Sequence, residues 1–268
     1  MKLKNFWTIV FALGFAMSLH ADTHIVNKIE WHYTVYGEKS TIVNGQGSSA
    51  AIPATTKGAV RIPKKLGKAE VTTIGNGAFL KCAEITDINI PKKVTKIDSK
   101  AFSGCKGLTK ITLPPKLAEI GVEAFKDCEG LTQISFPATL RTIGADSFKN
   151  CKGLTRITFP SKMEKIGPSA FNGCTALKEI SLPSGLQIVS GKAFAGCKAL
   201  TKVTIPEGVT VIAENAFADC PALTTVKLPN SLVTISTDAF KGCDKITDMK
   251  IPASVKFLDE SLKKFQKK

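Results

Sequence analysis

The chain has few of the residues that carry chemistry. Its 268 residues include three histidines, two tryptophans and two tyrosines. The histidines are His20, His24 and His32, all near the N-terminus. Acid–base and nucleophilic catalysis depend on such bases, and zinc requires clustered Cys or His ligands. Beyond residue 32 the sequence offers no Ser-His-Asp or Cys-His arrangement. We therefore predict no enzymatic activity, no cofactor and no metal site.

Long apolar runs are missing after the first twenty residues. The one such run, Phe6 to Leu19, follows the basic residues Lys2 and Lys4 and is shorter than the roughly 20 residues of a membrane-spanning helix. This pattern is typical of a signal peptide, here residues 1–21. We therefore expect an exported protein without a transmembrane segment. The sequence does not distinguish a periplasmic protein from one that is secreted or held on the outer surface.

Acidic residues are outnumbered by basic ones. The 37 Lys and Arg residues against 22 Asp and Glu residues give a formal net charge of +15. Such a balance affects solubility and attraction to polyanions, and does not determine the fold. Nucleic acid is not expected as a partner outside the cytoplasm. An acidic glycan or an anionic protein surface remains open, as does a solvated coat of lysines without a partner.

Three residue types recur with one period. The eight cysteines are 23 residues apart and lie at Cys82, Cys105, Cys128, Cys151, Cys174, Cys197, Cys220 and Cys243. A phenylalanine stands three residues before each cysteine, from Phe79 to Phe240, and prolines recur from Pro91 to Pro252. One supersecondary unit is therefore repeated about eight times. The period predicts an α/β repeat solenoid of the leucine-rich-repeat type, with a parallel β-sheet.

Each unit is expected to contain two short extended segments. Ile111 and Leu113 alternate with polar residues and predict a strand with one inward face. Pro114 removes a ladder donor and ends that strand. Leu117 and Ile120 turn inward again as a second extended segment.

A one-turn helix is expected to close each coil. Ala124, Phe125 and Cys128 have helical spacing, and Gly121 stands where Gly, Asp or Ser would serve as a helix N-cap. The residue directly before each repeat cysteine is Gly, Asn or Asp, except for Lys81 in the first unit. Because these residue types tolerate positive φ, that position predicts a turn.

The repeat cysteines are predicted to be free and buried. Equivalent residues of neighbouring coils are separated by at least the 4.7–4.9 Å spacing of parallel strands. This spacing exceeds the roughly 3.5–4.5 Å between the Cβ atoms of a disulfide. We therefore expect eight thiols that pack as small hydrophobic groups.

The repeat carries a family resemblance. The pattern Leu-x-x-Ile-x-Leu-Pro-x-x-Leu-x-x-Ile-Gly-x-x-Ala-Phe-x-x-Cys-x-x resembles the BspA-like (treponemal-type) class of bacterial leucine-rich repeats over about Val71 to Asp259. The resemblance implies a non-enzymatic, exported or cell-surface scaffold that binds a protein partner, and it suggests an adhesin. The alternative is a structural periplasmic protein that binds an envelope polyanion or glycan through exposed lysines. The ligand and the oligomeric state stay open.

Both ends depart from the repeat. The expected divisions are residues 1–21 as signal peptide, 22–61 as N-terminal β cap, 62–258 as solenoid and 259–268 as a helical C-terminal cap with Asp259 as N-cap. In the N-terminal cap a strand over residues 29–35 is expected to pair with residues 40–43 across a turn at 37–38, followed by a flexible loop at 45–49. Trp31, Tyr33 and Tyr36 are expected to cover the open end of the core.

Two outward columns change character along the chain. Two residues past each proline stand Lys93, Lys116, Thr139 and Lys162, then Gly185, Gly208, Ser231 and Ser254. Before the second inward Ile stand Lys96, Glu119, Thr142 and Lys165, then Ile188, Val211, Thr234 and Phe257. We predict a protein-binding column at Ile188, Val211, Thr234 and Phe257, and polyanion-binding lysines at Lys93, Lys96, Lys116, Lys162 and Lys165. The alternative is that the apolar residues only fit a local variation in coil shape.

Overall fold

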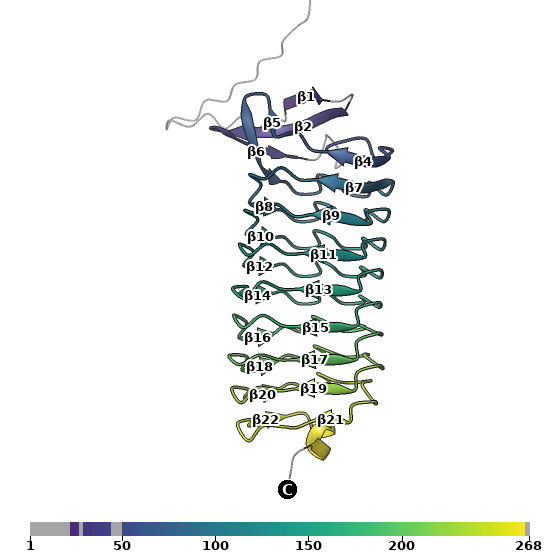
Figure 1. Ribbon diagram of the computed structural model, residues 1–268, viewed down its shortest axis with the longest axis vertical. Coiled ribbons are helices and arrows are strands. Elements are labelled where there is room, and N and C mark those ends of the chain that lie inside the picture. Colours follow the sequence, from purple (N-terminus) through teal and green to yellow (C-terminus); the bar gives the residue numbers. More distant parts are fainter. Residues whose placement is uncertain (1–21, 27–28, 44–49, 266–268) are drawn as a thin grey trace, which may run out of the picture.

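The computed structural model describes residues 22–26, 29–43 and 50–265 of the chain. These residues form a rod of stacked coils with additional strands at the N-terminal end (Figure 1). The predicted signal peptide, residues 1–21, and the predicted loop at 45–49 lie outside the described residues. Within the described part of the chain, no helix has the length and apolar character needed to cross a membrane.

Each coil contributes one strand to each of two sides of the rod. Sheet B contains nine strands: β4 (Gly58–Arg61), β7 (Ile85–Asn89), β9 (Lys110–Thr112), β11 (Gln133–Ser135), β13 (Arg156–Thr158), β15 (Glu179–Ser181), β17 (Lys202–Thr204), β19 (Thr225–Lys227) and β21 (Asp248–Met249). Its strands are parallel, and partners such as Ile134 and Ile157 are equivalent residues of neighbouring coils. The predicted stack of parallel 23-residue coils is confirmed.

The second strand of each coil lies in sheet A or sheet C. Sheet A contains β1 (Asp22–Val26), β2 (Ile29–Tyr36), β3 (Lys39–Ile42), β5 (Lys65–Leu66), β6 (Ala69–Ile74), β8 (Lys96–Ile97), β10 (Glu119–Ile120), β12 (Thr142–Ile143) and β14 (Lys165–Ile166). Sheet C contains β16 (Ile188–Val189), β18 (Val211–Ile212), β20 (Thr234–Ile235) and β22 (Phe257–Leu258). The side of the rod formed by the second segments is therefore divided between two sheets.

The expected one-turn helix is wrong. In the Phe-x-x-Cys turn (the Phe turn) of the third repeat, φ is 55° at Glu123 and 58° at Asp127, whereas an α-helix requires negative φ throughout. With a left-handed residue at each end of this turn, every second N–H points along the rod. The N–H groups of Glu123, Phe125 and Asp127 donate to carbonyls of the next coil at 2.9, 2.7 and 2.8 Å. The chain is thus a β-solenoid, not an α/β one.

This three-bond pattern, which we name the turn ladder, joins all successive Phe turns from Gly77–Lys81 to Asn215–Asp219. The residue before each cysteine has positive φ, as predicted, including Lys81 at 59°. A second positive-φ column, four residues earlier, was not predicted. Lys100, Glu123 and Lys192 in this column are residue types that give no turn signal, whereas its other members do. These others are Gly77, Asp146, Ser169, Asn215 and Asp238.

The glycine assigned to a helix N-cap has another role. A Cβ atom built on Gly121 would lie 2.7 Å from the backbone carbon of Asp98 in the preceding coil. Since real Cβ atoms do not approach so closely, glycine at this position permits close stacking of coils. The position does not cap a helix.

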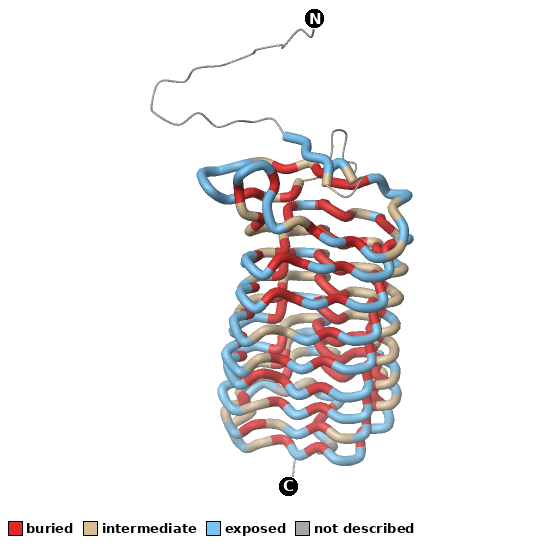
Figure 2. The backbone as a smooth tube through the Cα atoms, turned by 45° about the horizontal axis from the view of Figure 1, so that its top comes forward, coloured by how far each residue is buried: buried red, intermediate tan, exposed pale blue. Residues whose placement is uncertain are grey.

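The phenylalanines and cysteines form the centre of the core, and Figure 2 shows buried segments recurring at the same places from coil to coil. Rings from Phe79 to Phe240 stack with centroids 5.0–5.5 Å apart. Each cysteine from Cys105 to Cys243 donates its thiol to the carbonyl of the phenylalanine 26 residues earlier. All eight cysteines are free and buried, which confirms that prediction.

At the N-terminal end, β1, β2 and β3 form an antiparallel meander, and β3 joins the solenoid through parallel pairing with β6. Trp31 is fully buried, with its ring edge-on to Phe79 at 6.2 Å, and Tyr33 is also buried. These two residues cover the core as predicted. The same prediction is wrong for Tyr36, which is 72% exposed.

The structure does not support the helical cap expected at residues 259–268. The described chain ends in one six-residue 3-10 segment, η2 (Glu260–Phe265). The Asp259 carboxylate accepts hydrogen bonds from the N–H and hydroxyl groups of Ser261 and from the N–H of Asp238 in the preceding coil. Leu262 is buried against the last coil. This end is therefore closed by one carboxylate and a short 3-10 turn.

The backbone hand of the Phe turn can be tested at Lys192, an exposed residue with a φ of 56°. We expect Lys192→Val to lower the free energy of unfolding by about 1–2 kcal/mol relative to Lys192→Gly, because side chains with a branched Cβ are strained at this φ. Urea unfolding measures the difference. Lys198, exposed and without positive φ, is the control, where the Val variant should be at least as stable as the Gly variant. Equal stabilities at Lys192 would contradict the assigned conformation.

Thiol chemistry tests the core. Burial raises the pKa of the Cys82 thiol to about 11 and that of Cys197 to about 12, so these groups stay protonated and inaccessible at pH 8. We expect maleimide to modify almost none of the native cysteines and all eight after denaturation without reductant. Detection of disulfides in the denatured sample would contradict the stacking of free thiols.

The raised pKa values of the buried thiols make the stability of the fold depend on pH. Unfolded thiols ionise near their ordinary pKa of 9.0, whereas buried thiols retain their protons to higher pH. The stability that these two protonated thiols contribute is therefore complete below about pH 9 and is lost as pH rises from about 9 to about 12. Thermal unfolding across this range should show a falling Tm.

Candidate interaction surface on sheets A and C

The predicted protein-binding residues form one continuous column. Ile188 is the register partner of Val211, Val211 of Thr234, and Thr234 of Phe257, each pair on neighbouring strands of sheet C. In β16, β18 and β20 the next residue, Val189, Ile212 or Ile235, is buried in the core, so the column side chain points outward. Phe257 is exposed on β22. We name these four residues the sheet C column. The spacing between its members is that of parallel strands, about 4.8 Å.

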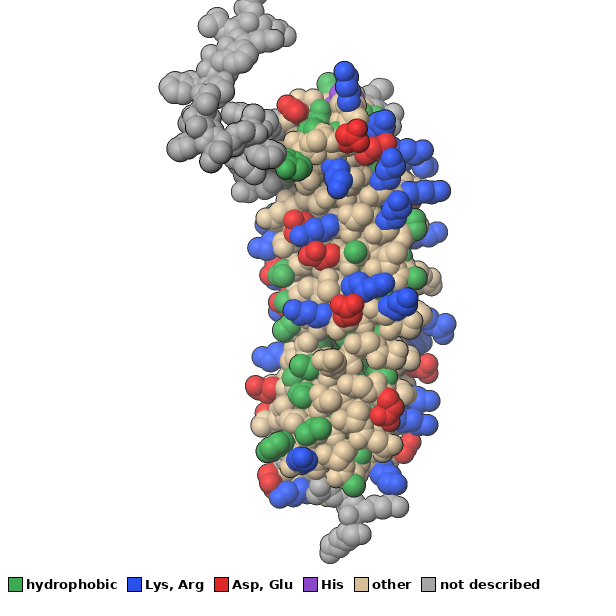
Figure 3. All heavy atoms as spheres, turned by 90° about the vertical axis from the view of Figure 1, so that its left-hand side faces the viewer, with side chains coloured by type: hydrophobic (Ala, Val, Ile, Leu, Met, Phe, Trp, Pro, Cys, Tyr) green, Lys and Arg blue, Asp and Glu red, His purple; other side chains and the backbone are tan. Residues whose placement is uncertain are grey.

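The column is accessible to solvent and apolar at both ends. Ile188 is 50% exposed and Phe257 is 65% exposed, while Val211 and Thr234 are half-buried. Figure 3 shows hydrophobic side chains over the C-terminal part of this face, whereas charged side chains of both signs cover its N-terminal part. Ile188 and Phe257 are both among the large apolar residues that are exposed in the described part of the chain.

The apolar column begins where sheet A ends. Strands β14 and β16 are not paired, so sheets A and C are separate. In the coils on either side, the N–H groups of Gly167 and Ala213 donate to carbonyls of their preceding coils at 2.8 and 2.9 Å. At the break, the Ser190 hydroxyl donates instead to the carbonyl of Ile166. Coil shape does vary here, but Ile188 and Phe257 project into solvent and fill no gap in the core.

Two of the predicted polyanion-binding lysines are already paired. Nζ of Lys93 lies 3.1 Å from Oε1 of Glu70. Nζ of Lys96 lies 3.4 Å from Oε1 of Glu119 and 3.7 Å from Oδ1 of Asp98. These carboxylates reduce the positive potential that the two lysines offer to a ligand.

The other three predicted lysines, Lys116, Lys162 and Lys165, are exposed and make no ion pair with any residue that the structure describes. Lys116 and Lys162 are separated by the coil of Thr139. The hydroxyl of Thr139 donates to two backbone carbonyls of the coil before it. The lysines therefore lie along the face without converging on one point.

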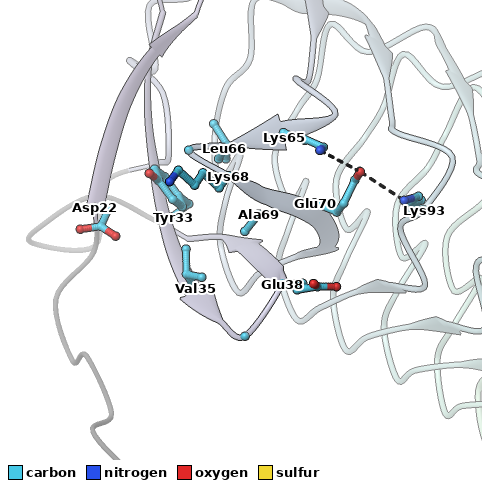
Figure 4. Close-up of a pocket in the computed structure, with 12 residues that line it drawn as sticks. Asp22, Tyr33, Val35, Glu38, Lys65, Leu66, Lys68, Ala69, Glu70 and Lys93 are labelled. Carbon is cyan, nitrogen blue, oxygen red and sulfur yellow. Dashed lines mark ion pairs between the residues drawn. The ribbon is translucent and has the colours of Figure 1, made fainter.

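A polar cavity of about 630 Å³ lies beside the N-terminal cap, between β2 and the β5–β6 hairpin (Figure 4). Glu70 on its wall bridges Lys93 at 3.1 Å and Lys65 at 3.6 Å. The hydrogen bond from Lys93 and the charge of both ammonium groups hold the pKa of Glu70 below its ordinary value. With Lys68, Glu38 and Asp22 also on the wall, three basic and three acidic side chains line the cavity, and it shows no preference for one sign of ligand.

No cluster of three His, Cys, Asp or Glu side chains within the described ranges is arranged to hold a metal ion. The protein is a repeated scaffold whose outward columns of side chains differ in charge and polarity.

Comparison with known proteins agrees with this geometry. The profile of the BspA type leucine rich repeat region matches residues 72–198 and 141–267, with six copies. The chain belongs to this family. The resemblance seen in the repeat pattern is thereby confirmed. No curated protein matches the chain.

One solved structure supports the fold, and others match the chain less well. The crystal structure of a T. pallidum leucine rich repeat protein matches with 26% sequence identity and a TM-score of 0.57, covering 81% of this chain and 88% of that protein. A leucine rich cell surface protein from Faecalibacterium prausnitzii has 20% identity and a TM-score of 0.42, covering 87% of this chain and 89% of its own. The pneumococcal vaccine antigen PcpA has 20% identity and a TM-score of 0.44, and the match covers 89% of this chain and 78% of that protein.

Proposed function

We propose that this member of the BspA type family is an exported, non-enzymatic scaffold that acts as an adhesin. It binds a protein partner through the sheet C column. The observation that carries the proposal is the in-register column of Ile188, Val211, Thr234 and Phe257 on a surface otherwise rich in charge. Contiguous exposed apolar groups are costly in water and mark interaction sites. Membership of a repeat-scaffold family supports the same function.

The column has the features of a protein-binding site. Phe257 supplies an aromatic anchor, the kind of residue that dominates binding energy at interfaces. The neighbouring outward column contains Gly185 and Gly208, which leave the flank of the apolar residues open to a partner. Because the strands hold the side chains at a fixed spacing, binding orders little of the scaffold.

A second function is supported by the unpaired lysines. Lys116, Lys162 and Lys165 carry charge that no described carboxylate neutralises, and they could bind an envelope polyanion or glycan as a structural periplasmic protein would. Salt distinguishes the two functions, because screening weakens binding by exposed charges while apolar contacts persist.

The protein-binding function is tested by replacing Ile188, Val211 and Phe257 together with Thr, Thr and Lys, residue types found at this position in other coils. Because the replaced side chains lie outside the core, we expect little change in stability, about 0.5 kcal/mol or less per site. Capture of the extracellular protein partner should fall by at least about thirtyfold, since truncating one aromatic anchor costs about 2 kcal/mol or more. The measurement is affinity capture by purified protein at low and high salt.

The matched control replaces Lys116, Lys162 and Lys165 with Gln on the same side of the rod. Under the protein-binding function this control should retain capture at both salt concentrations. If the lysine variant loses capture and the apolar variant keeps it, the polyanion function is correct. If the apolar variant unfolds, its residues belong to the core and the proposed surface does not exist.

A further inference from the structure

Sheet B carries a polar surface that the proposed function does not use. In five consecutive strands, β9 to β17, the central residue is buried and both flanking residues are exposed. The residues after the buried position form a hydroxyl column of Thr112, Ser135, Thr158, Ser181 and Thr204. The residues before it form a column of Lys110, Gln133, Arg156, Glu179 and Lys202. The shallow groove between the two columns is named the sheet B channel.

The channel is hollowed along the rod. One cavity of about 570 Å³ lies over β9 and β11 and is lined by Lys110, Thr112, Gln133 and Ser135 among others. A second, of about 380 Å³, lies over β13, β15 and β17. Because the strands are in register, the two cavities follow one line parallel to the stacking axis. Their floor is the backbone of the buried central residues, including Ile134 and Ile180.

The side chains of the channel are unpartnered, as are Lys116, Lys162 and Lys165 on the other side of the rod. None of the ten makes a hydrogen bond or ion pair with a residue in the described ranges. On the neighbouring threonine column, by contrast, hydroxyls such as that of Thr109 donate to the carbonyl of the preceding coil at 3.1 Å. Some lysines elsewhere are paired, such as Lys152 and Lys106, which lie 3.2 and 3.8 Å from Glu129. The channel therefore retains its full capacity to bind a polar ligand.

The chemistry of the walls defines the ligand. Lys110, Arg156 and Lys202 face one carboxylate within these strands, Glu179, and Asp87 of β7 is the register partner of Lys110 at one end. The column therefore keeps a net positive charge, and the channel favours anions. Arg and Lys donate charge-assisted hydrogen bonds to carboxylates, while hydroxyls and the Gln133 amide both donate to and accept from alcohols. The channel has no aromatic or large aliphatic side chain on either wall, so it lacks the anchors of a protein interface.

From this combination we propose that the sheet B channel binds an extended acidic polysaccharide lying along the stacking axis. Its carboxylates contact the cationic column, and its hydroxyl groups contact the hydroxyl column. A linear glycan presents both groups repeatedly along its length, which matches two columns that repeat at about 4.8 Å. This site is on a different sheet from the sheet C column and is independent of the proposed protein-binding function.

The test uses calorimetric titration of the full chain with polygalacturonate, a carboxylated glycan, and with its methyl-esterified form, which is neutral. We expect the acidic form to bind and the ester to bind at least about tenfold more weakly, because charge-assisted hydrogen bonds are lost.

Replacing Lys110, Arg156 and Lys202 with Gln should weaken binding of the acidic form by at least about tenfold. Replacing Thr112, Thr158 and Thr204 with Val, which keeps a strand-compatible shape, should weaken it about threefold or more. Replacing Glu179 with Gln should strengthen it.

The matched control changes Lys81, Lys192 and Lys198 to Gln, which removes the same charge from exposed positions in and beside the Phe turns, outside the strands of all three sheets. Its binding should stay within about twofold of the parent at physiological salt. The proposal is overturned if the control loses as much affinity as the channel variant, since binding would then reflect net charge. It is also overturned if poly-glutamate binds as tightly as the glycan, if the Thr to Val variant binds normally, or if the parent binds no acidic glycan. Protein capture by the sheet C column is unaffected by any of these outcomes.

Discussion

The hydrogen bonds between successive Phe turns hold the rest of the structure in register. Two left-handed residues in each turn, such as Glu123 and Asp127, direct three N–H groups toward the next coil. The turns are thereby held close enough for the phenylalanine rings to stack at 5.0–5.5 Å and for each cysteine to bond a carbonyl of the preceding turn. A turn closed by a helix would use the same N–H groups within the coil and leave nothing to bind its neighbour.

This register explains how one scaffold carries several surfaces. Because equivalent residues stack, one substitution per coil creates a continuous column without disturbing the core. The sheet C column is apolar at Ile188, Val211 and Phe257, while the sheet B channel is polar from Lys110 to Thr204. On the side of the rod formed by sheets A and C, the outward column becomes apolar at the break between β14 and β16. At this break the Ser190 hydroxyl replaces a backbone N–H as the donor to the preceding coil. Surface chemistry and local backbone geometry therefore change together.

Features that follow from the 23-residue period could be predicted from the sequence. The strands, the buried free thiols, the positive φ before each cysteine and the alignment of the sheet C column all follow from counting in steps of 23. The prediction of a closing helix failed because the spacing of Ala124, Phe125 and Cys128 fits a turn with left-handed residues at both ends as well as it fits a helix. The sequence signal for that turn is the column four residues before the pre-cysteine position, where Gly77 and Asn215 favour a turn and Lys100 does not. The pairing of Lys93 with Glu70 depends on the β5–β6 hairpin, which interrupts the repeat and was not foreseen.

Amide hydrogen exchange tests the turn ladder most directly. The N–H groups of Phe125 and Phe148 donate across coils at 2.7 Å, whereas no acceptor among the described residues receives the N–H of Phe240 in the last turn. We predict that the amides of Phe125 and Phe148 exchange only through global unfolding, and that Phe240 exchanges at least about a hundredfold faster by local opening. Equal, fast exchange at all three positions would show that the turns are not bonded to one another and would contradict the account.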